Sequence, residues 1–248
     1  MNKQIFIQIS VAVLTVSILG IHSNAQQPPA QSANASHQAI SQNASAEQIV
    51  NLDVLKNKLK QYHDCKCTCG CYAHDLDAQA DRAIAFLRRR AANKRVNEKL
   101  ALVLDIDETS LSNYEELLQS GFNYTKREWD VWIDSAKAPA IPGTLRLYRK
   151  AQELGVSIFF ITGRNESQRA ATERNLTEQG YTGWQKLIMR PNLAAPQTTI
   201  AYKSSMRAQI AGEGYKLVLN AGDQWSDLKG TPEAQFSVKY PDPYYLIP

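Results

Sequence analysis

Five short apolar runs, separated by helical stretches, set the strongest constraint on the fold of this chain. They cover residues 100–105, 156–162, 186–189, 217–219 and 236–238. The longer runs are almost continuously apolar, which indicates strands that are buried on both faces. Strands that alternate with helices favour an α/β fold, with a Rossmann-like parallel sheet flanked by helices.

Acidic residues follow the first of these runs. Asp105 and Asp107 stand two positions apart, so on a strand that leaves the sheet their side chains point to the same side. Ligands of such sheets bind at the carboxyl ends of the strands. One carboxylate there can attack phosphorus, and the other can protonate the leaving alkoxide. Because adjacent carboxylates repel each other, the pair also predicts a hard cation such as Mg²⁺. For this segment alone, a solvated acidic turn is the alternative.

Three further polar clusters follow later runs. Thr162 and Gly163 end the second run and precede a helix, where a hydroxyl and free backbone N–H groups suit a phosphate oxygen. Lys203 directly precedes a predicted helix start, and its charge can neutralise phosphate and keep a carboxylate ionised. Asp223 and Asp227 follow the fourth run and offer the further carboxylates that a six-coordinate Mg²⁺ site needs. Each cluster is weak evidence alone, so the order of the clusters is the stronger signal.

This order of motifs resembles the haloacid-dehalogenase (HAD) superfamily from about Leu100 to the end of the chain. Within that superfamily, the segments DIDETSLSN, AIPG, ITGR and KYPDPYY, together with Trp129 and Trp132, look like the secreted acid phosphatases. That group includes bacterial class C-type acid phosphatases and plant vegetative storage proteins. The helical stretch from about Ala46 fits the same group. The resemblance therefore covers nearly all of the chain that would remain after removal of an N-terminal signal peptide, which is described below.

The resemblance implies roles for the motif residues. It makes Asp105 the nucleophile and Asp107 the general acid and base. Thr162 and Lys203, beside Gly163, would hold the phosphate. Repulsion between the two carboxylates is expected to raise the pKa of Asp107, whereas Mg²⁺ and Lys203 are expected to lower the pKa of Asp105.

The same resemblance implies Mg²⁺ as the cofactor. Its ligands would be Asp105, Asp223 and the backbone carbonyl of Asp107, with Asp227 as a supporting carboxylate. The expected protein is an exported, Mg²⁺-dependent acid phosphatase that acts on small phosphomonoesters, with nucleotides among the candidates. A phosphotransferase and a non-catalytic storage or metal-binding protein are alternatives on the same fold. Some storage-protein relatives lack the nucleophilic Asp, whereas this sequence keeps Asp105.

Residues 108–141 separate the first strand from the helix expected at Pro142. The segment is too long for a turn, and we expect it to form a small, mainly helical cap insert over the site. Its aromatic side chains could stack on a nucleobase or an aryl leaving group. Trp129 and Trp132 are expected to form the core of the insert, whereas Tyr114, close behind the catalytic loop, is the better candidate for a substrate contact.

The N-terminus predicts export. Lys3 precedes an apolar stretch that ends beside small residues of the kind a signal peptidase reads, so we interpret residues 1–25 as a cleaved signal peptide. A stretch this short makes a membrane anchor the weaker alternative, and a secreted or periplasmic location follows. Residues 26–45, rich in Gln, Ala, Ser and Asn, are expected to be a disordered linker. Residues 46–248 are expected to form the phosphatase domain, which begins with a helical segment.

All cysteines of the chain lie in one short segment, at Cys65, Cys67, Cys69 and Cys71. In an exported protein they predict local disulfides, and four cysteines allow three pairings. Alternatively, the thiolates and the nearby His74 could bind a soft metal. The spacing differs from that of common structural zinc sites, and pairs this close strain a disulfide. Disulfides, a metal site and an incidental cluster all stay open, and we assign the segment no catalytic role.

The charge of the chain gives little support to a nucleic-acid partner. The net charge is +4, and basic residues gather in Arg88-Arg89-Arg90 and Lys94-Arg95. A solvated helix end explains such a cluster more simply than a nucleic-acid surface does. We therefore expect a small-molecule phosphomonoester as the partner and no nucleic acid polymer, and the sequence leaves the oligomeric state open.

Overall fold

The computed structural model describes residues 49–67, 70–192 and 197–247. The predicted signal peptide and linker, residues 1–25 and 26–45, lie outside the described residues. In the part of the chain that is described, no helix combines the length and the apolar character needed to cross a membrane.

A parallel sheet of five strands forms the centre of the described chain. The strands are β1 (Lys99–Leu104), β2 (Ser157–Asn165), β3 (Lys186–Arg190), β4 (Tyr215–Gly222) and β5 (Phe236–Lys239). Their order in the sheet is β3-β2-β1-β4-β5. The chain therefore builds outward on one side of β1 and then on the other. This reversal confirms the predicted α/β fold and places the topological switch point at β1.

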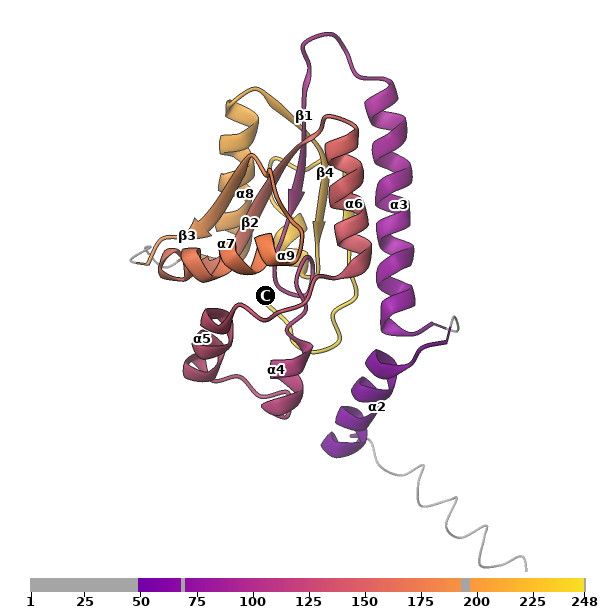
Figure 1. Ribbon diagram of the computed structural model, residues 1–248, viewed down its shortest axis with the longest axis vertical. Helices are drawn as coiled ribbons and strands as arrows, with labels where there is room; N and C mark the ends of the chain where they lie inside the picture. The colour runs from indigo at the N-terminus through magenta and orange to yellow at the C-terminus, as the bar shows by residue number, and fades with distance from the viewer. Residues whose placement is uncertain (1–48, 68–69, 193–196, 248) are drawn as a thin grey trace, which may run out of the picture. The chain divides into compact units, whose positions relative to one another are not determined.

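Helices cover both faces of the sheet (Figure 1). Outside the segment between β1 and α6, the helical elements of the described residues are α2 (Leu52–Asp64), α3 (Tyr72–Ala92), α6 (Pro142–Glu153), the 3₁₀ turn η1 (Glu166–Gln168), α7 (Arg169–Glu178), α8 (Thr199–Gly212) and the short α9 (Trp225–Leu228), of which α2 packs on α3 and not on the sheet (Figure 1). Helices α3 and α6 pack against each other, and α8 packs against β2 and β4. The expected N-terminal helical segment is therefore present as α2 and α3.

Strand β1 is buried on both faces because its side chains alternate between them. Leu100, Leu102 and Leu104 join the larger hydrophobic cluster, which includes residues of α3 and α6. Ala101 and Val103 join a second cluster with residues of α8. The two clusters hold β1 rigidly at the centre of the sheet, so the residues that follow it are fixed in position.

The segment between β1 and α6 carries two short helices, α4 (Tyr114–Gln119) and α5 (Lys126–Ser135). In Figure 1, β1 and β4 run towards this insert, which lies beyond their carboxyl ends. Trp132 is buried in the larger cluster, and its indole N–H donates to Asn113 Oδ1 at 2.8 Å. Trp129 is half-buried against the same cluster. The insert is therefore joined to the main core through its tryptophans.

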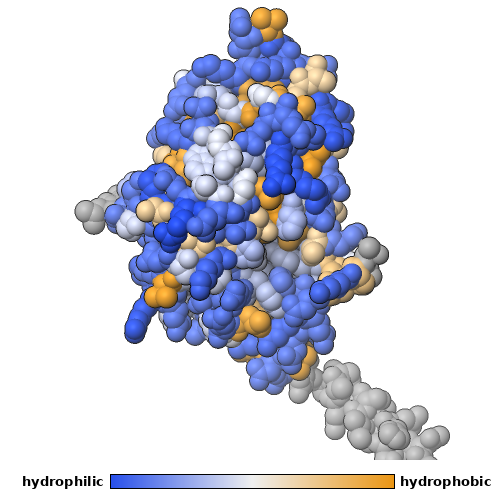
Figure 2. Space-filling view, in the orientation of Figure 1, coloured by the Kyte–Doolittle hydropathy of each residue, from blue (hydrophilic) through white to orange (hydrophobic). Residues whose placement is uncertain are grey.

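The face shown in Figure 2 is mainly hydrophilic, and its hydrophobic residues form small, separate patches. The large apolar side chains of the strands are buried instead, among them Phe159 and Phe160 of β2. Full burial of one such side chain stabilises a fold by about 1.5–3 kcal/mol. The sheet core is therefore the main source of stability, and it fixes the strand ends at which polar residues gather.

Candidate active site

Residues from three strand ends and one helix meet at a cavity of about 620 Å³. Asp105 follows β1, Gly163 lies near the end of β2, and Asp223 follows β4. Lys203 reaches the same cavity from α8. The cavity thus lies at the carboxyl ends of the strands around the switch point, where α/β folds bind their ligands.

Lys203 connects two carboxylates inside this cavity. Its ammonium nitrogen lies 2.5 Å from Asp105 Oδ1 and 2.5 Å from Asp227 Oδ1, and all three side chains are buried. The predicted helix start after Lys203 is wrong. Helix α8 begins at Thr199, after Thr198, whose side chain caps it, so Lys203 lies in the second turn and points into the site.

Three carboxylates form a group that fits a hard cation. One oxygen each from Asp105, Asp223 and Asp227 lies within 4.8 Å of the others. Burial raises the pKa of Asp105 to about 7, and Asp227 adds to the shift although Lys203 opposes it. Burial and Asp227 also raise the pKa of Asp223. A single ammonium leaves this group with excess negative charge, and all-oxygen donors suit Mg²⁺.

The geometry adds Asp227 to the candidates for the predicted ligand set. Asp227, expected only as a supporting residue, stands beside Asp105 and Asp223 with its carboxylate in the same group. The side chain of Asp107 is not part of that group and turns to another partner. A contribution of Asp107 to the metal would therefore come from its backbone carbonyl, as expected from the sequence.

Asp107 pairs with Arg164. The guanidinium contacts the carboxylate through Nη2, 2.7 Å from Oδ1, and through Nε, 3.1 Å from the same oxygen. Arg164 Nη1 also donates to Thr172 Oγ1 at 3.2 Å, which fixes the guanidinium plane. Burial alone would raise the pKa of Asp107, but Arg164 and a hydrogen bond from Asn113 outweigh burial and hold that pKa below its ordinary value. The pKa of Asp107 is thus lowered, whereas a rise was expected from the sequence.

Asn113 and Glu108 brace the loop that carries Asp107. The Asn113 side chain donates to Asp107 Oδ1 at 2.9 Å, and its backbone N–H donates to Glu108 Oε1 at 2.6 Å. Tyr245, in the C-terminal tail, donates from its hydroxyl to Glu108 Oε2 at 2.6 Å. Glu108 has a φ of 50°, a left-handed backbone conformation that residues other than glycine rarely adopt without such support. Burial and the charge of Asp107 raise the pKa of Glu108 to about 8.

Gln224 connects the predicted metal ligand Asp223 to the C-terminal tail. Its side-chain nitrogen donates to Asp223 Oδ2 at 2.7 Å and to Asp242 Oδ2 at 2.6 Å. Its side-chain oxygen accepts from the backbone N–H of Ile247 at 3.1 Å. The tail therefore orients Asp223. In the sequence, only the segment KYPDPYY points to this part of the chain, and its resemblance to acid phosphatases assigns no role to the tail.

The end of β2 presents its backbone and Arg164 to the cavity, rather than the Thr162 hydroxyl. Thr162 is fully buried, and its Oγ1 accepts a hydrogen bond from the backbone N–H of Arg164 at 3.1 Å. Gly163 and Arg164 line the cavity, and Thr162 is not among the described lining residues. In this conformation Thr162 shapes the loop that carries Gly163.

Tyr114 does not take the position expected for a substrate contact. Its ring stacks on that of His63, with the centroids 3.3 Å apart and the planes 14° apart, and it also contacts Tyr244. Tyr114 is not among the described residues that line the cavity. The apolar wall of the cavity is formed by other residues of the insert and the tail, namely Leu117, Phe122, Tyr124, Trp129, Tyr244 and Leu246.

Plant proteins are similar to part of this sequence. Acid phosphatase 1 of Solanum lycopersicum is 38% identical over 148 residues, which cover 58% of this chain and 58% of that relative. Vegetative storage protein 1 of Arabidopsis thaliana is 32% identical over 207 residues, which cover 81% of this chain and 74% of that relative. The chain thus spans less than two thirds of the length of the tomato protein.

A solved structure and a family model agree with these relatives. The class C acid phosphatase from Bacillus anthracis with tungstate bound superposes with a TM-score of 0.64 at 23% identity, covering 79% of this chain and 86% of that chain. This likeness supports the fold. Residues 23–248 match the family model for the HAD superfamily, subfamily IIIB (Acid phosphatase). Because the match spans most of the sequence, the chain belongs to subfamily IIIB of the HAD superfamily, the acid phosphatase subfamily.

Proposed function

We propose that this chain is an exported, Mg²⁺-dependent acid phosphatase that hydrolyses small phosphomonoesters through an aspartyl-phosphate at Asp105. The observation that carries the proposal is the contact of 2.5 Å between Lys203 Nζ and Asp105 Oδ1 inside the cavity. A buried carboxylate held by a cation beside two further carboxylates suits attack on a phosphate group. Export is proposed from the sequence of residues 1–25 alone.

In the first step, a carboxylate oxygen of Asp105 attacks phosphorus, and the bond from phosphorus to the leaving oxygen breaks. Asp107 transfers its proton to that oxygen, so the leaving group departs as an alcohol. Lys203 favours the ionised form of Asp105 and neutralises phosphate charge. Mg²⁺ bound by Asp105, Asp223 and Asp227 would supply further neutralisation of the phosphate oxygens.

In the second step, the ionised Asp107 removes a proton from a water molecule, and the water oxygen attacks phosphorus. The bond between phosphorus and the Asp105 oxygen breaks, which releases inorganic phosphate and restores both side chains. Arg164 and Asn113 hold Asp107 in place through both steps. The same residue can serve as acid and then as base because each step reverses its protonation.

The lining of the cavity bears on the choice of substrate, and the catalytic residues bear on the alternative functions. The apolar wall of the cavity, which includes Phe122, Tyr124 and Trp129, suits an aryl group or a nucleobase. Phosphotransfer to an acceptor alcohol would use the same aspartyl-phosphate. A storage role is suggested by the vegetative storage relative, but the complete set of Asp105, Asp107 and Lys203 favours catalysis.

A phosphate-release screen tests this function. The purified chain is assayed with nucleoside monophosphates, sugar phosphates and aryl phosphates, each with and without Mg²⁺ and with and without an added alcohol. We expect Mg²⁺-dependent release of inorganic phosphate, with little phosphate transferred to the alcohol. Transfer exceeding release would favour the phosphotransferase, and the absence of turnover on every substrate would favour the storage protein.

Removal of divalent cations is expected to lower the rate of phosphate release at least about tenfold, and Mg²⁺ is expected to restore it. The reason is the excess negative charge of the group formed by Asp105, Asp223 and Asp227. Chelation with EDTA followed by desalting, and then titration with Mg²⁺, gives the measurement. Calorimetry should show weaker Mg²⁺ binding in Asp223→Asn than in Asp134→Asn, which changes an exposed carboxylate on α5. Full activity in protein shown to be metal-free contradicts the prediction.

Replacement of Arg164 by Ala is expected to move the alkaline limb of the rate profile to higher pH. The acid step needs protonated Asp107, so the rate falls as pH rises through the pKa of that group. Arg164 lowers this pKa, and its removal therefore raises it. The measurement is kcat against pH with an alkyl phosphate. In Arg164→Lys, which keeps the charge, the alkaline limb should lie closer to that of the wild type. An alkaline limb that does not move in Arg164→Ala contradicts the prediction.

A further inference from the structure

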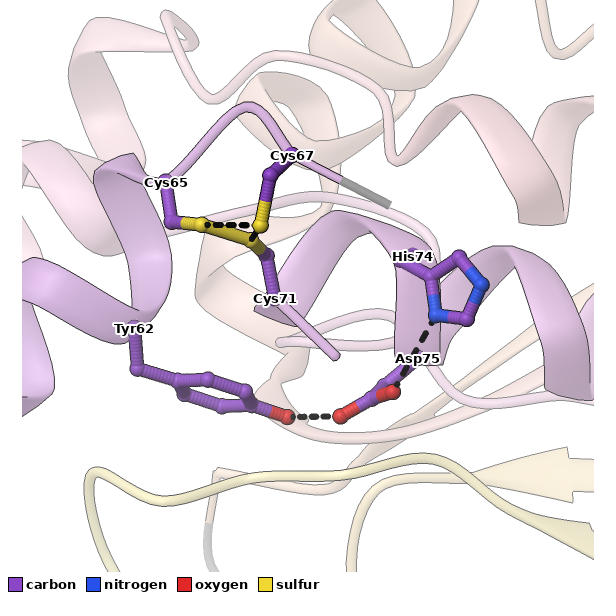
Figure 3. Close-up of a disulfide and its surroundings, with 6 residues drawn as sticks. All are labelled: Tyr62, Cys65, Cys67, Cys71, His74 and Asp75. Carbon is purple, nitrogen blue, oxygen red and sulfur yellow. Dashed lines mark hydrogen bonds and ion pairs between the residues drawn. A yellow bond between two sulfur atoms is a disulfide. The ribbon is translucent and has the colours of Figure 1, made fainter. Parts of the chain in front are cut away.

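The turn between α2 and α3 gathers three cysteine sulfurs, which we call the sulfur cluster: Cys65, Cys67 and Cys71. Cys65 and Cys71 form a disulfide, which confirms a local disulfide among the possibilities left open by the sequence (Figure 3). Cys67 Sγ lies 3.2 Å from the sulfur of Cys65 and 3.4 Å from that of Cys71. Cys67 is disulfide-bonded as well. The fourth cysteine, Cys69, lies outside the described residues.

We propose that the sulfur cluster, once its disulfides are reduced, binds one thiophilic d¹⁰ cation, Cu⁺ or Zn²⁺, through the thiolates of Cys65, Cys67 and Cys71. The site is separate from the proposed phosphatase chemistry. It uses different residues, a different donor atom and a different class of metal.

The sulfur positions already approach those of a metal site. Tetrahedral zinc with bonds of about 2.3 Å to sulfur sets thiolate sulfurs about 3.8 Å apart. The sulfur of Cys67 therefore needs to move by only about half an ångström relative to those of Cys65 and Cys71, and the latter two sulfurs separate from each other when their disulfide is reduced. The backbone supports the arrangement, since Gly70, with a φ of 100°, reverses the chain directly before Cys71.

The surroundings of the cluster favour thiolates and allow an ion to enter. Cys71 is the N-cap of α3, and the positive end of a helix stabilises negative charge there. Cys71 is buried, Cys65 is half-buried and Cys67 is exposed, so one side rests on the protein and the other opens to solvent.

The donors of the site are sulfur atoms alone. Figure 3 shows His74 turned towards Asp75, with its Nδ1 at 3.5 Å from Asp75 Oδ1. His63 Nδ1 lies 3.0 Å from Asp64 Oδ1, and the His63 ring stacks on Tyr114. Thiolate donors without imidazole or carboxylate select Cu⁺ and Zn²⁺ over Mg²⁺. The sulfur cluster would therefore not compete for the cation of the active site.

Two chemical changes lead from the disulfide form to the metal form. Each disulfide bond breaks when a dithiol supplies two electrons and two protons, which gives two cysteine thiols and joins the sulfurs of the dithiol. The cation then replaces the protons of three thiols, which pass to solvent. In an oxidising compartment the disulfide form prevails, so reduction controls access to the site.

Metal retention by the full-length chain tests this proposal. The Cys69→Ser chain is reduced with a dithiol, desalted without oxygen, loaded with Cu⁺ or with Zn²⁺ in excess Mg²⁺, desalted again and analysed for metal. The excess Mg²⁺ keeps Zn²⁺ from the carboxylates of the active site. We expect one equivalent of metal with thiolate-to-metal absorption in the ultraviolet, and no retention by the unreduced wild-type protein.

Two variants and one matched control decide the outcome. Cys67→Ser leaves two thiolates of the cluster and should bind Cu⁺ at least about tenfold more weakly in competition with a chelator. The triple variant Cys65→Ser, Cys67→Ser, Cys71→Ser should retain no metal, with circular dichroism to show that it folds. His74→Ala should bind as tightly as its parent. Retention of metal by the triple variant, or none by reduced Cys69→Ser, overturns the proposal.

Discussion

Replacement of Asp105 by Asn is expected to lower the rate of phosphate release at least about 10⁴-fold and to leave the fold intact. Asn cannot form the acyl phosphate, so the route through a covalent intermediate closes. The change keeps the size of the side chain, which lies in a tightly packed place beside Lys203 and Asp227. The loss should appear with every substrate, because each substrate must phosphorylate Asp105, whichever leaving group departs.

Steady-state rates and a direct trap of the intermediate together measure this effect. In the wild type, borohydride added during turnover should convert the phosphorylated Asp105 to homoserine, and peptide mapping should find the product only at that position. Asp134→Asn makes the same chemical change at an exposed site on α5 and should keep the wild-type rate. Turnover near the wild-type rate in a folded Asp105→Asn variant, or homoserine at another position, contradicts the assignment.

The arrangement of the site could be predicted from the sequence where it depends on strand ends. Asp105 and Asp223 follow buried apolar runs, and parallel strands end at a common edge, so their convergence follows from periodicity alone. Lys203 was identified by its place in the order of motifs. The start of its helix is wrong because Thr198, an equally good cap, starts α8 at Thr199, so that Lys203 lies inside the helix.

The contacts that hold the catalytic loop could not be predicted in this way. Arg164 lies 57 residues from Asp107, and Tyr245 lies 137 residues from Glu108. No periodic pattern connects such positions, because the contacts depend on where side chains point after the chain has packed. Tyr114 shows the same limit, since it lies close to the loop in sequence but stacks on His63 of α2.

Burial and the neighbouring charges shift the pKa values of the two catalytic carboxylates in directions opposite to those that the chemistry needs. Burial raises the pKa of Asp105 to about 7, whereas Arg164 lowers that of Asp107 despite burial, so a proton prefers the nucleophile over the acid. A cation among Asp105, Asp223 and Asp227 favours the ionised form of Asp105. Phosphate charge next to Asp107 favours its protonated form. We therefore expect the rate to depend on the cation and to peak on the acid side of neutrality, with both limbs of the profile belonging to the coupled pair.

The acid role of Asp107 predicts a second large effect, which depends on the leaving group. For Asp107→Asn, we expect the rate of enzyme phosphorylation to fall about 10²–10⁴-fold with alkyl phosphates and much less with aryl phosphates. An alkoxide is a strong base that needs a proton as it departs, whereas a phenolate leaves with less help. Asn keeps an oxygen that can accept from Arg164, so the loop should stay in place.

The measurement must isolate the first step, because Asp107 also activates water in the second. Single-turnover experiments across substrates of rising leaving-group pKa give the ratio of wild-type to variant rates for phosphorylation alone. Asp130→Asn removes a carboxylate that lines the same cavity from α5 and serves as the control, for which this ratio should stay flat. For Asp107→Asn the ratio should rise steadily with leaving-group pKa. A ratio that stays flat from aryl to alkyl substrates would remove Asp107 from the acid role and leave it only its backbone carbonyl as a metal ligand.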